Sequence, residues 1–148
     1  MPNNLFFRLL RPILVNSWNP FRWLLLQLFF RRLPQIKARS LAKESPFLKI
    51  PKEKWINESE NAFVVKDIAP RTPVHLLVIP KQRIPSMLEA SPALLGELLQ
   101  LAKETAQQVG IAEKGFRIVI NTNPHGVQTV YHLHIHIMGG RQLSVPLK

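Results

Sequence analysis

The amino-acid sequence predicts an α+β domain built on an antiparallel sheet. Runs of apolar and β-branched residues, separated by turn signals, recur through residues 62–138 and indicate strands. One amphipathic helix lies apart from them, between Ser91 and Gly110. Strands joined by turns, with a segregated helix, are typical of the α+β class. The 148 residues suffice for one full domain and a short appendage.

The predicted elements follow one another along the chain. Strands are expected at residues 62–67, 74–80 and 116–121. The second is apolar on both faces, so we expect it at the centre of the sheet. The helix has Ser91 as its N-cap, Pro92 at its first position and Gly110 at its end. Its leucine-rich stripe indicates a side that faces the core.

A final strand, ended by Gly139 and Gly140, carries three of the chain's five histidines. Because successive side chains of a strand point to opposite faces, His132, His134 and His136 share one face. A helix would scatter the three rings by roughly 200° per step. The sequence therefore predicts a row of imidazoles on a rigid element, which is a candidate chemical site.

Composition excludes several classes of function. The chain has no cysteine, so disulfides, thiolate catalysis and cysteine-based zinc sites are ruled out. Its formal net charge is +11, but residues 1–43 contain eight Lys or Arg and no acidic residue. The rest of the chain is nearly balanced, so we expect no nucleic-acid groove on it.

Residues 1–45 form a basic, apolar N-terminal arm, which we separate from a domain at residues 46–148. The arm's longest apolar run is too short for a bilayer, which needs about 20 residues. Aromatic residues mixed with arginine suit a helix lying on an anionic membrane surface. The alternatives are an organellar targeting segment, or packing on the domain or a second subunit. Pro34 and Lys37–Glu44 are expected to form the linker. We expect a cytoplasmic protein, peripheral at a membrane if the arm binds lipid, or else an organelle-targeted one.

The histidine row admits two chemical interpretations. Alternate histidines on a strand can hold zinc, although no nearby acid or cysteine completes a familiar ligand set. In the other interpretation His134, the middle ring, attacks phosphorus and forms a labile phosphoramidate. Asn121, Gln128 and Thr129 offer hydrogen-bond donors, and no carboxylate follows Lys114. Such surroundings suit an anionic substrate.

The segment Gln128–Arg141 closely resembles the signature of the histidine triad (HIT) family, in particular its Hint branch of nucleoside phosphoramidases. Asp67–Pro70 and Pro73–Lys81 also match the family's pattern, and the resemblance covers roughly residues 46–148. It implies a HIT-like antiparallel sheet with one long helix and a short helix, preceded here by a helical arm. It also implies a homodimer whose two sheets join, with no cofactor and no metal.

The resemblance assigns a role to each matching position. His134 is the nucleophile, His136 and His75 border the α-phosphate, and His132 orients the nucleophile. The phosphate and leaving group are contacted by Asn121, Gln128 and Thr129, of which Thr129 also serves catalysis. Asp67 binds the ribose, and the purine pocket is lined by Phe47, Ile50, Val65 and Ile68. Val127 stands where the family commonly has a glycine, which bears on a backbone contact to the phosphate.

The expected function is therefore hydrolysis of purine nucleoside phosphoramidates through a nucleotidyl-histidine intermediate. The enzymatic alternative is a dinucleoside polyphosphate hydrolase or nucleotidyl transferase. From another class, the chain could be a membrane-held nucleotide-binding module with little turnover.

Overall fold

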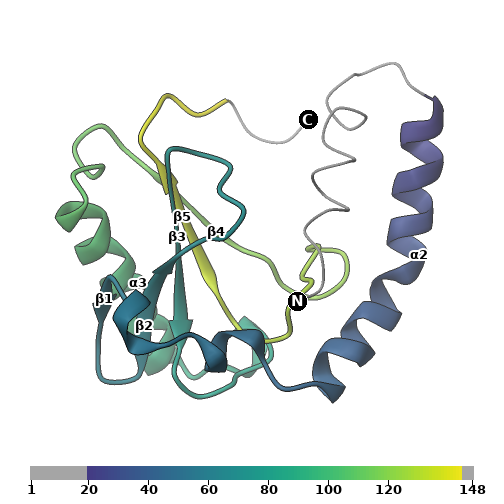
Figure 1. The fold of residues 1–148 in the computed structure, drawn as a ribbon, viewed down its shortest axis with the longest axis horizontal. Coiled ribbons are helices and arrows are strands. Elements are labelled where there is room, and N and C mark those ends of the chain that lie inside the picture. The colour runs from purple at the N-terminus through teal and green to yellow at the C-terminus, as the bar shows by residue number, and fades with distance from the viewer. Residues whose placement is uncertain (1–19, 145–148) are drawn as a thin grey trace.

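The computed structural model describes residues 20–144, with side chains described from Leu24 onward. Its helices are α2 (Pro20–Ala42) and α3 (Pro92–Gln108), joined by short 3-10 helices at Pro46–Lys49, Lys52–Lys54 and Met87–Glu89. Its strands are β1 (Asn57–Glu58), β2 (Ala62–Lys66), β3 (Val74–Pro80), β4 (Arg117–Ile120) and β5 (Ile135–Gly139). The α+β prediction is confirmed. Figure 1 shows α3 against the sheet and α2 standing to one side of it.

The five strands form one antiparallel sheet in the order β1-β2-β3-β5-β4. β3 lies in the middle, as its two apolar faces predicted. The short edge strand β1 was not expected from the sequence. β5 runs between β3 and β4, so the last strand in the sequence is an inner strand of the sheet. This position fixes His136, which β5 carries.

Each face of the sheet has its own apolar cluster. On one face Leu76 and Val78 of β3 pack with Leu133, Ile135 and the buried side of α3. The opposite face carries a second cluster built from Phe63, Val65, Leu77 and Ile79. The 3-10 segment after α2 covers this second cluster with Phe47, Ile50 and Trp55.

α3 begins and ends where the sequence predicted. The Ser91 hydroxyl accepts the Leu94 amide as an N-cap, and Pro92 follows it. Gly110 takes a positive φ of 73° directly after the C-cap, a conformation open to glycine at little cost.

The last strand is shorter than predicted, because regular pairing begins only at Ile135. Continuing the β3–β5 register would set Pro80 opposite Leu133. Proline has no N–H to donate, and the Pro80 carbonyl accepts the His132 ring instead. His132 and His134 therefore lie in the extended approach to β5, and only His136 belongs to the strand.

The predicted linker is wrong. α2 continues through Pro34 as far as Ala42, so Lys37–Ala42 are helical rather than a loose connection. Proline inside a helix removes one backbone hydrogen bond, but Lys37 and Ser40 beyond it are anchored to the loop that precedes β5. Within residues 20–144 no helix is long and apolar enough to cross a membrane. Residues 1–19 of the predicted N-terminal arm lie outside the described residues.

Candidate active site

The three histidines of the row face the same side of the sheet, as predicted. The Phe47 ring packs at 5.6 Å from the His132 ring and 5.2 Å from the His134 ring, centroid to centroid. The His134 and His136 rings lie 5.1 Å apart, edge to face. His132 and His134 are buried, whereas His136 is partly exposed. A ligand can therefore approach the row at its His136 end.

The hydrogen bonds of His134 leave one nitrogen ready to attack. Its Nδ1 lies 2.8 Å from the His132 carbonyl oxygen. A carbonyl oxygen only accepts, so Nδ1 carries the proton and Nε2 keeps its lone pair. Burial lowers the pKa of His134, which keeps the ring neutral at neutral pH. A neutral imidazole with a free Nε2 is the form that a nucleophile needs.

His132 is held in one orientation by partners on both ring nitrogens. Its Nε2 donates to the Pro80 carbonyl oxygen at 2.8 Å. Nδ1 must then accept, and the Ser45 hydroxyl lies 2.7 Å away as its donor. Burial lowers the pKa of His132 as well. With neither nitrogen free, His132 can orient His134 but cannot bind a metal or substrate through its ring.

His136, at the end of the row, forms a hydrogen-bonded pair with His75 of β3. The Arg71 backbone N–H donates to His75 Nδ1 at 3.1 Å, so the proton of a neutral His75 ring is on Nε2. That Nε2 lies 2.9 Å from His136 Nδ1 and donates to it. The proton of a neutral His136 ring is therefore on its own Nε2. His136 is thus set up as a hydrogen-bond donor next to the nucleophile.

Asp67 faces this pair rather than open solvent. Its Oδ2 lies 3.3 Å from His75 Nε2 and 3.7 Å from His136 Nδ1, and its Oδ1 accepts the Ala69 amide at 2.8 Å. Burial lowers the pKa of His75, although the Asp67 charge acts in the opposite direction. Burial, together with the neighbouring His134 and His75, lowers the pKa of His136 to about 4. Both rings are neutral at pH 7.

One ligand atom from each of Asp67, His75 and His136 lies within 4.8 Å of the other two, a spacing that a metal ion could use. The hydrogen bonds argue against it. A metal needs a lone pair on His75 Nε2, but the Arg71 amide places the proton on that nitrogen. These residues therefore do not fit a metal ion in this arrangement.

The predicted purine-pocket residues are only partly together. Phe47 and Ile50 pack on the cluster that contains Val65, on the histidine side of the sheet. Ile68 is 87% exposed and does not join them. A separate groove of about 840 Å³ lies near the C-terminal end of α3, lined among others by Lys114, Arg117 and Arg141. None of the predicted site residues lines that groove.

The three predicted phosphate contacts differ in what their side chains do. Gln128 is 1% exposed, and its side chain is committed to the loop. Its Nε2 donates to the Pro85 and Val130 carbonyls, and its Oε1 accepts the Asn123 amide. Asn121 and Thr129 are half-buried and make no side-chain hydrogen bond within residues 20–144. Asn121 and Thr129 are thus available to a ligand, whereas the Gln128 side chain is not.

Sequence reasoning missed two contributors, Ser45 and the backbone of Arg71. Ser45 precedes Pro46 as the N-cap of a 3-10 helix, and that Ser-Pro pair was a readable signal. Its hydroxyl accepts the Phe47 amide while donating to His132. The Arg71 amide gave no signal, because any residue except proline would supply it.

Comparisons with known proteins agree with this arrangement. The HIT domain family model matches residues 49–143. A purine nucleoside phosphoramidase of Escherichia coli K12 is 38% identical over 111 residues, covering 70% of this chain and 93% of that protein. The adenylylsulfatase HINT1 of Arabidopsis thaliana is 42% identical over 118 residues, covering 76% of each chain.

Solved structures give the same result. A HIT family hydrolase from Legionella pneumophila superposes with a TM-score of 0.65 at 39% identity, covering 70% of this chain and 98% of that one. The segment matched by the family model holds the whole sheet, α3 and the histidine row. The chain therefore belongs to the HIT domain family.

Proposed function

We propose that this chain is a nucleotide hydrolase that cleaves the P–N bond of purine nucleoside phosphoramidates, with His134 as its nucleophile. The observation that supports it best is the pair of fixed tautomers. Nδ1 of His134 donates to the His132 carbonyl, and His136 Nδ1 accepts from His75. The site thus offers a free lone pair on one ring and an N–H on the next.

The reaction divides into two displacements at the same phosphorus. In the first, a bond forms between His134 Nε2 and phosphorus while the P–N bond breaks, and the amine leaves with a proton taken up from solvent. In the second, water attacks phosphorus and releases a proton to solvent, the Nε2–P bond breaks, and the nucleoside monophosphate is released. In this proposal the His136 N–H, Asn121 and Thr129 stabilise the charge that develops on the phosphoryl oxygens.

The names of the relatives support a nucleotidyl group and leave the leaving group open. One relative is a phosphoramidase and another an adenylylsulfatase, so similar chains act on different leaving groups. A dinucleoside polyphosphate hydrolase or a nucleotidyl transferase would use the same first displacement. The choice depends on the residues that meet the leaving group, to which this proposal assigns Thr129.

The test is turnover of a fluorogenic adenosine phosphoramidate by the full chain, with His134→Ala as the variant and His125→Ala as control. His125 is exposed in the turn before the site. We expect His134→Ala to lose at least a thousandfold in kcat and to keep AMP affinity within severalfold, because only the covalent step is removed. Substantial turnover by His134→Ala would contradict the covalent mechanism. Loss of wild-type turnover on adding a chelator would return metal to the mechanism.

A homodimer is part of the proposal. β4 pairs only with β5 within the described chain, so its outer edge is free to join a second copy. The experiment is sedimentation of the wild type against Ile118→Pro, which removes a backbone N–H from the outer edge of β4, since the Val119 N–H faces His136 of β5. A monomeric wild type at micromolar concentration would contradict the dimer.

The first half of α2 suits a membrane surface. Leu24, Leu28 and Phe30 are 53%, 46% and 48% exposed, and Arg31 and Arg32 follow them. Apolar side chains beside arginines fit an anionic lipid interface. Flotation with anionic and neutral vesicles tests this, with a double variant that combines Leu24→Ser and Leu28→Ser. Equal flotation of the wild type and this variant would remove the membrane role of α2.

A further inference from the structure

The second half of α2 contacts the loop that leads into the histidine row. Lys37 Nζ donates to the Asn123 side-chain oxygen at 2.9 Å and lies 5.3 Å from the centre of the Tyr131 ring. Leu33, one turn earlier, is 2% exposed. The C-terminal half of this helix is therefore seated on the domain, while its first half projects from it (Figure 1).

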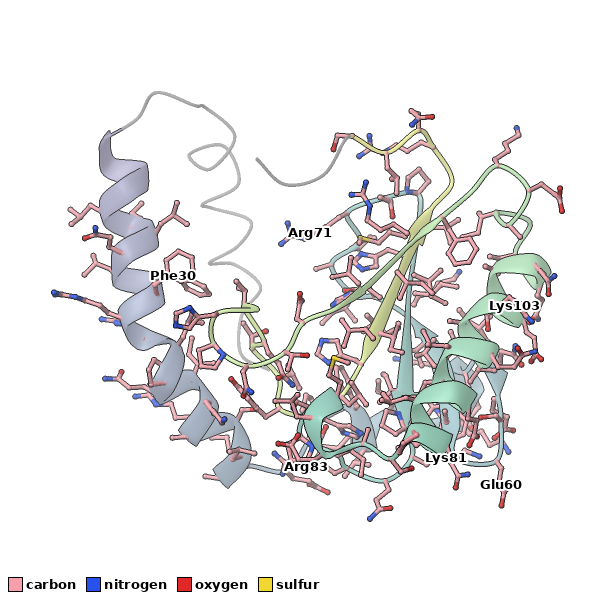
Figure 2. All side chains as sticks on the ribbon, turned by 180° about the vertical axis from the view of Figure 1, so that it is seen from behind. Phe30, Glu60, Arg71, Lys81, Arg83 and Lys103 are labelled. Carbon is pink, nitrogen blue, oxygen red and sulfur yellow. The ribbon has the colours of Figure 1, made fainter. Side chains whose placement is uncertain are left out.

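The peptide groups of Tyr131 are held on both sides. Its N–H donates to the Ser40 hydroxyl at 2.8 Å, and its carbonyl accepts Arg83 Nε at 3.2 Å. Arg83 in turn donates to the carbonyls of Ser40 and Lys43. Figure 2 shows Arg83 near the end of α2. A cation at a helix C-terminus also complements the helix dipole. Ser40 and Arg83 thus tie the end of α2 to the residue before His132.

Tyr131 is linked to the nucleophile His134 through the backbone of His132 and one hydrogen bond. Tyr131 precedes His132, whose carbonyl oxygen accepts the Nδ1–H of His134. A shift of the Tyr131–His132 peptide moves that carbonyl and weakens control of the His134 tautomer. The ring of His132 is held separately, by Ser45 and Pro80. The part of the row that depends on α2 is therefore its backbone.

The loop before Tyr131 is itself under strain. Asn123 and Val127 have φ values of 59° and 58°, in the left-handed region that L side chains rarely adopt. Gly126 lies against the backbone of Thr122 with no room for a Cβ atom. Such conformations persist only where surrounding contacts hold them. Lys37 supplies one such contact to Asn123, from a helix outside the segment 49–143 that the family model matches.

We propose that Lys37 and Ser40 are positioning residues for catalysis, and that the second half of α2 is a working part of the site. They hold the loop Asn121–Tyr131 so that the His132 carbonyl keeps the proton of His134 on Nδ1. The role concerns reaction geometry more than substrate affinity, because the two side chains contact Asn123 and Tyr131 rather than a histidine of the row. Because turnover is one of the measurements that detect this role, that part of the inference rests on the proposed function.

The experiment uses the full chain with Ser40→Ala, Lys37→Met and the pair combined. Ser40→Thr keeps the hydroxyl and serves as the rescue variant. Arg39→Ala is the matched control, since Arg39 is an exposed side chain on the same helix. The measurements are kcat and KM for the phosphoramidate, AMP affinity, thermal unfolding, exchange of the Tyr131 amide, and the ¹⁵N shifts of the His134 ring.

We expect Ser40→Ala and Lys37→Met each to lower kcat by about tenfold, with KM and AMP affinity within about twofold, because small misplacement of a reacting group is costly. Ser40→Ala should also speed Tyr131 amide exchange and alter the His134 ring shifts, while Ser40→Thr restores both. Unchanged kcat, or a loss of kcat matched by a loss of folded protein, would overturn the positioning role.

A wild-type chain without turnover would refute the proposed function and leave this inference to the two spectroscopic measurements. In that case, faster Tyr131 exchange with altered His134 shifts in Ser40→Ala would support it. Spectra identical to those of Arg39→Ala would overturn it.

Discussion

Nε2 of His75 lies 2.9 Å from Nδ1 of His136. Because His75 donates in this contact, the proton of His136 is on Nε2, the nitrogen that is left to meet a ligand. The Arg71 amide determines which of the two rings donates, because it donates to His75 Nδ1 and so leaves the His75 proton on Nε2. A backbone N–H can only donate, so one amide fixes two tautomers in sequence. His75, from β3, is thereby coupled to the end of the row on β5.

Replacing His75 by alanine should lower kcat by roughly ten- to a hundredfold, because His136 then loses the donor that keeps its proton on Nε2. AMP affinity should change much less. Kinetics together with ¹⁵N shifts of the His136 ring provide the measurement, and His125→Ala is the control. A His75→Ala enzyme with normal kcat would show that the tautomer of His136 is immaterial.

The pH profile of kcat/KM should keep its plateau below the usual histidine range. Burial lowers the pKa of His134, and it lowers that of His136 to about 4, so both rings stay neutral as pH falls through 6.5. Activity is then lost only when the pH reaches these lowered values. An acid limb at or above pH 6.5 would contradict this.

The same lowered pKa values affect stability with a defined sign. Between pH 6.5 and about 4 the unfolded chain binds protons that folded His136 does not, so the free energy of unfolding decreases as pH falls through this window. Circular dichroism at each pH separates loss of fold from protonation of the site.

Gln128→Ala should destabilise the fold by about 3 kcal/mol, because the partly buried carbonyls of Pro85 and Val130 and the Asn123 amide all lose their partner. That corresponds to a fall in Tm on the order of 10 °C. Gln108→Ala, an exposed glutamine on α3, is the matched control. A stable Gln128→Ala variant with weak AMP binding would instead support the phosphate contact predicted from the sequence.

Val127→Gly should raise Tm by roughly 2–4 °C, because the left-handed conformation costs a β-branched residue about 1–2 kcal/mol and glycine much less. Val130→Gly is the control, since Val130 has no positive φ and should be destabilised by the same change. Thermal unfolding measures both. Destabilisation of Val127→Gly would mean that the Val127 side chain packs more favourably than its φ costs.

Much of the site was predictable because its signals are local. Alternation placed His132, His134 and His136 on one face, and the apolar run of residues 74–80 predicted a central strand that brings His75 beside β5. The roles of Asp67, Asn121 and Thr129 stay predictions. The linker failed because Pro34 and the polar residues after it are loop signals, whereas contacts with Arg83 and with residues 121–131 anchor this part of the helix.

By itself the sequence determined α3, the longer strands of the sheet, the class of fold and the row of histidines, since these depend on the 2.0 and 3.6 periods of side chains along strands and helices. Tertiary structure alone decided the protonation pattern and the place of α2. Tautomers are set by acceptors and donors far away in the chain, such as Pro80 for His132 and Ser40 for Tyr131. Hydrogen bonds of that kind leave no periodic trace, because one polar atom at a fixed distance is enough to make them.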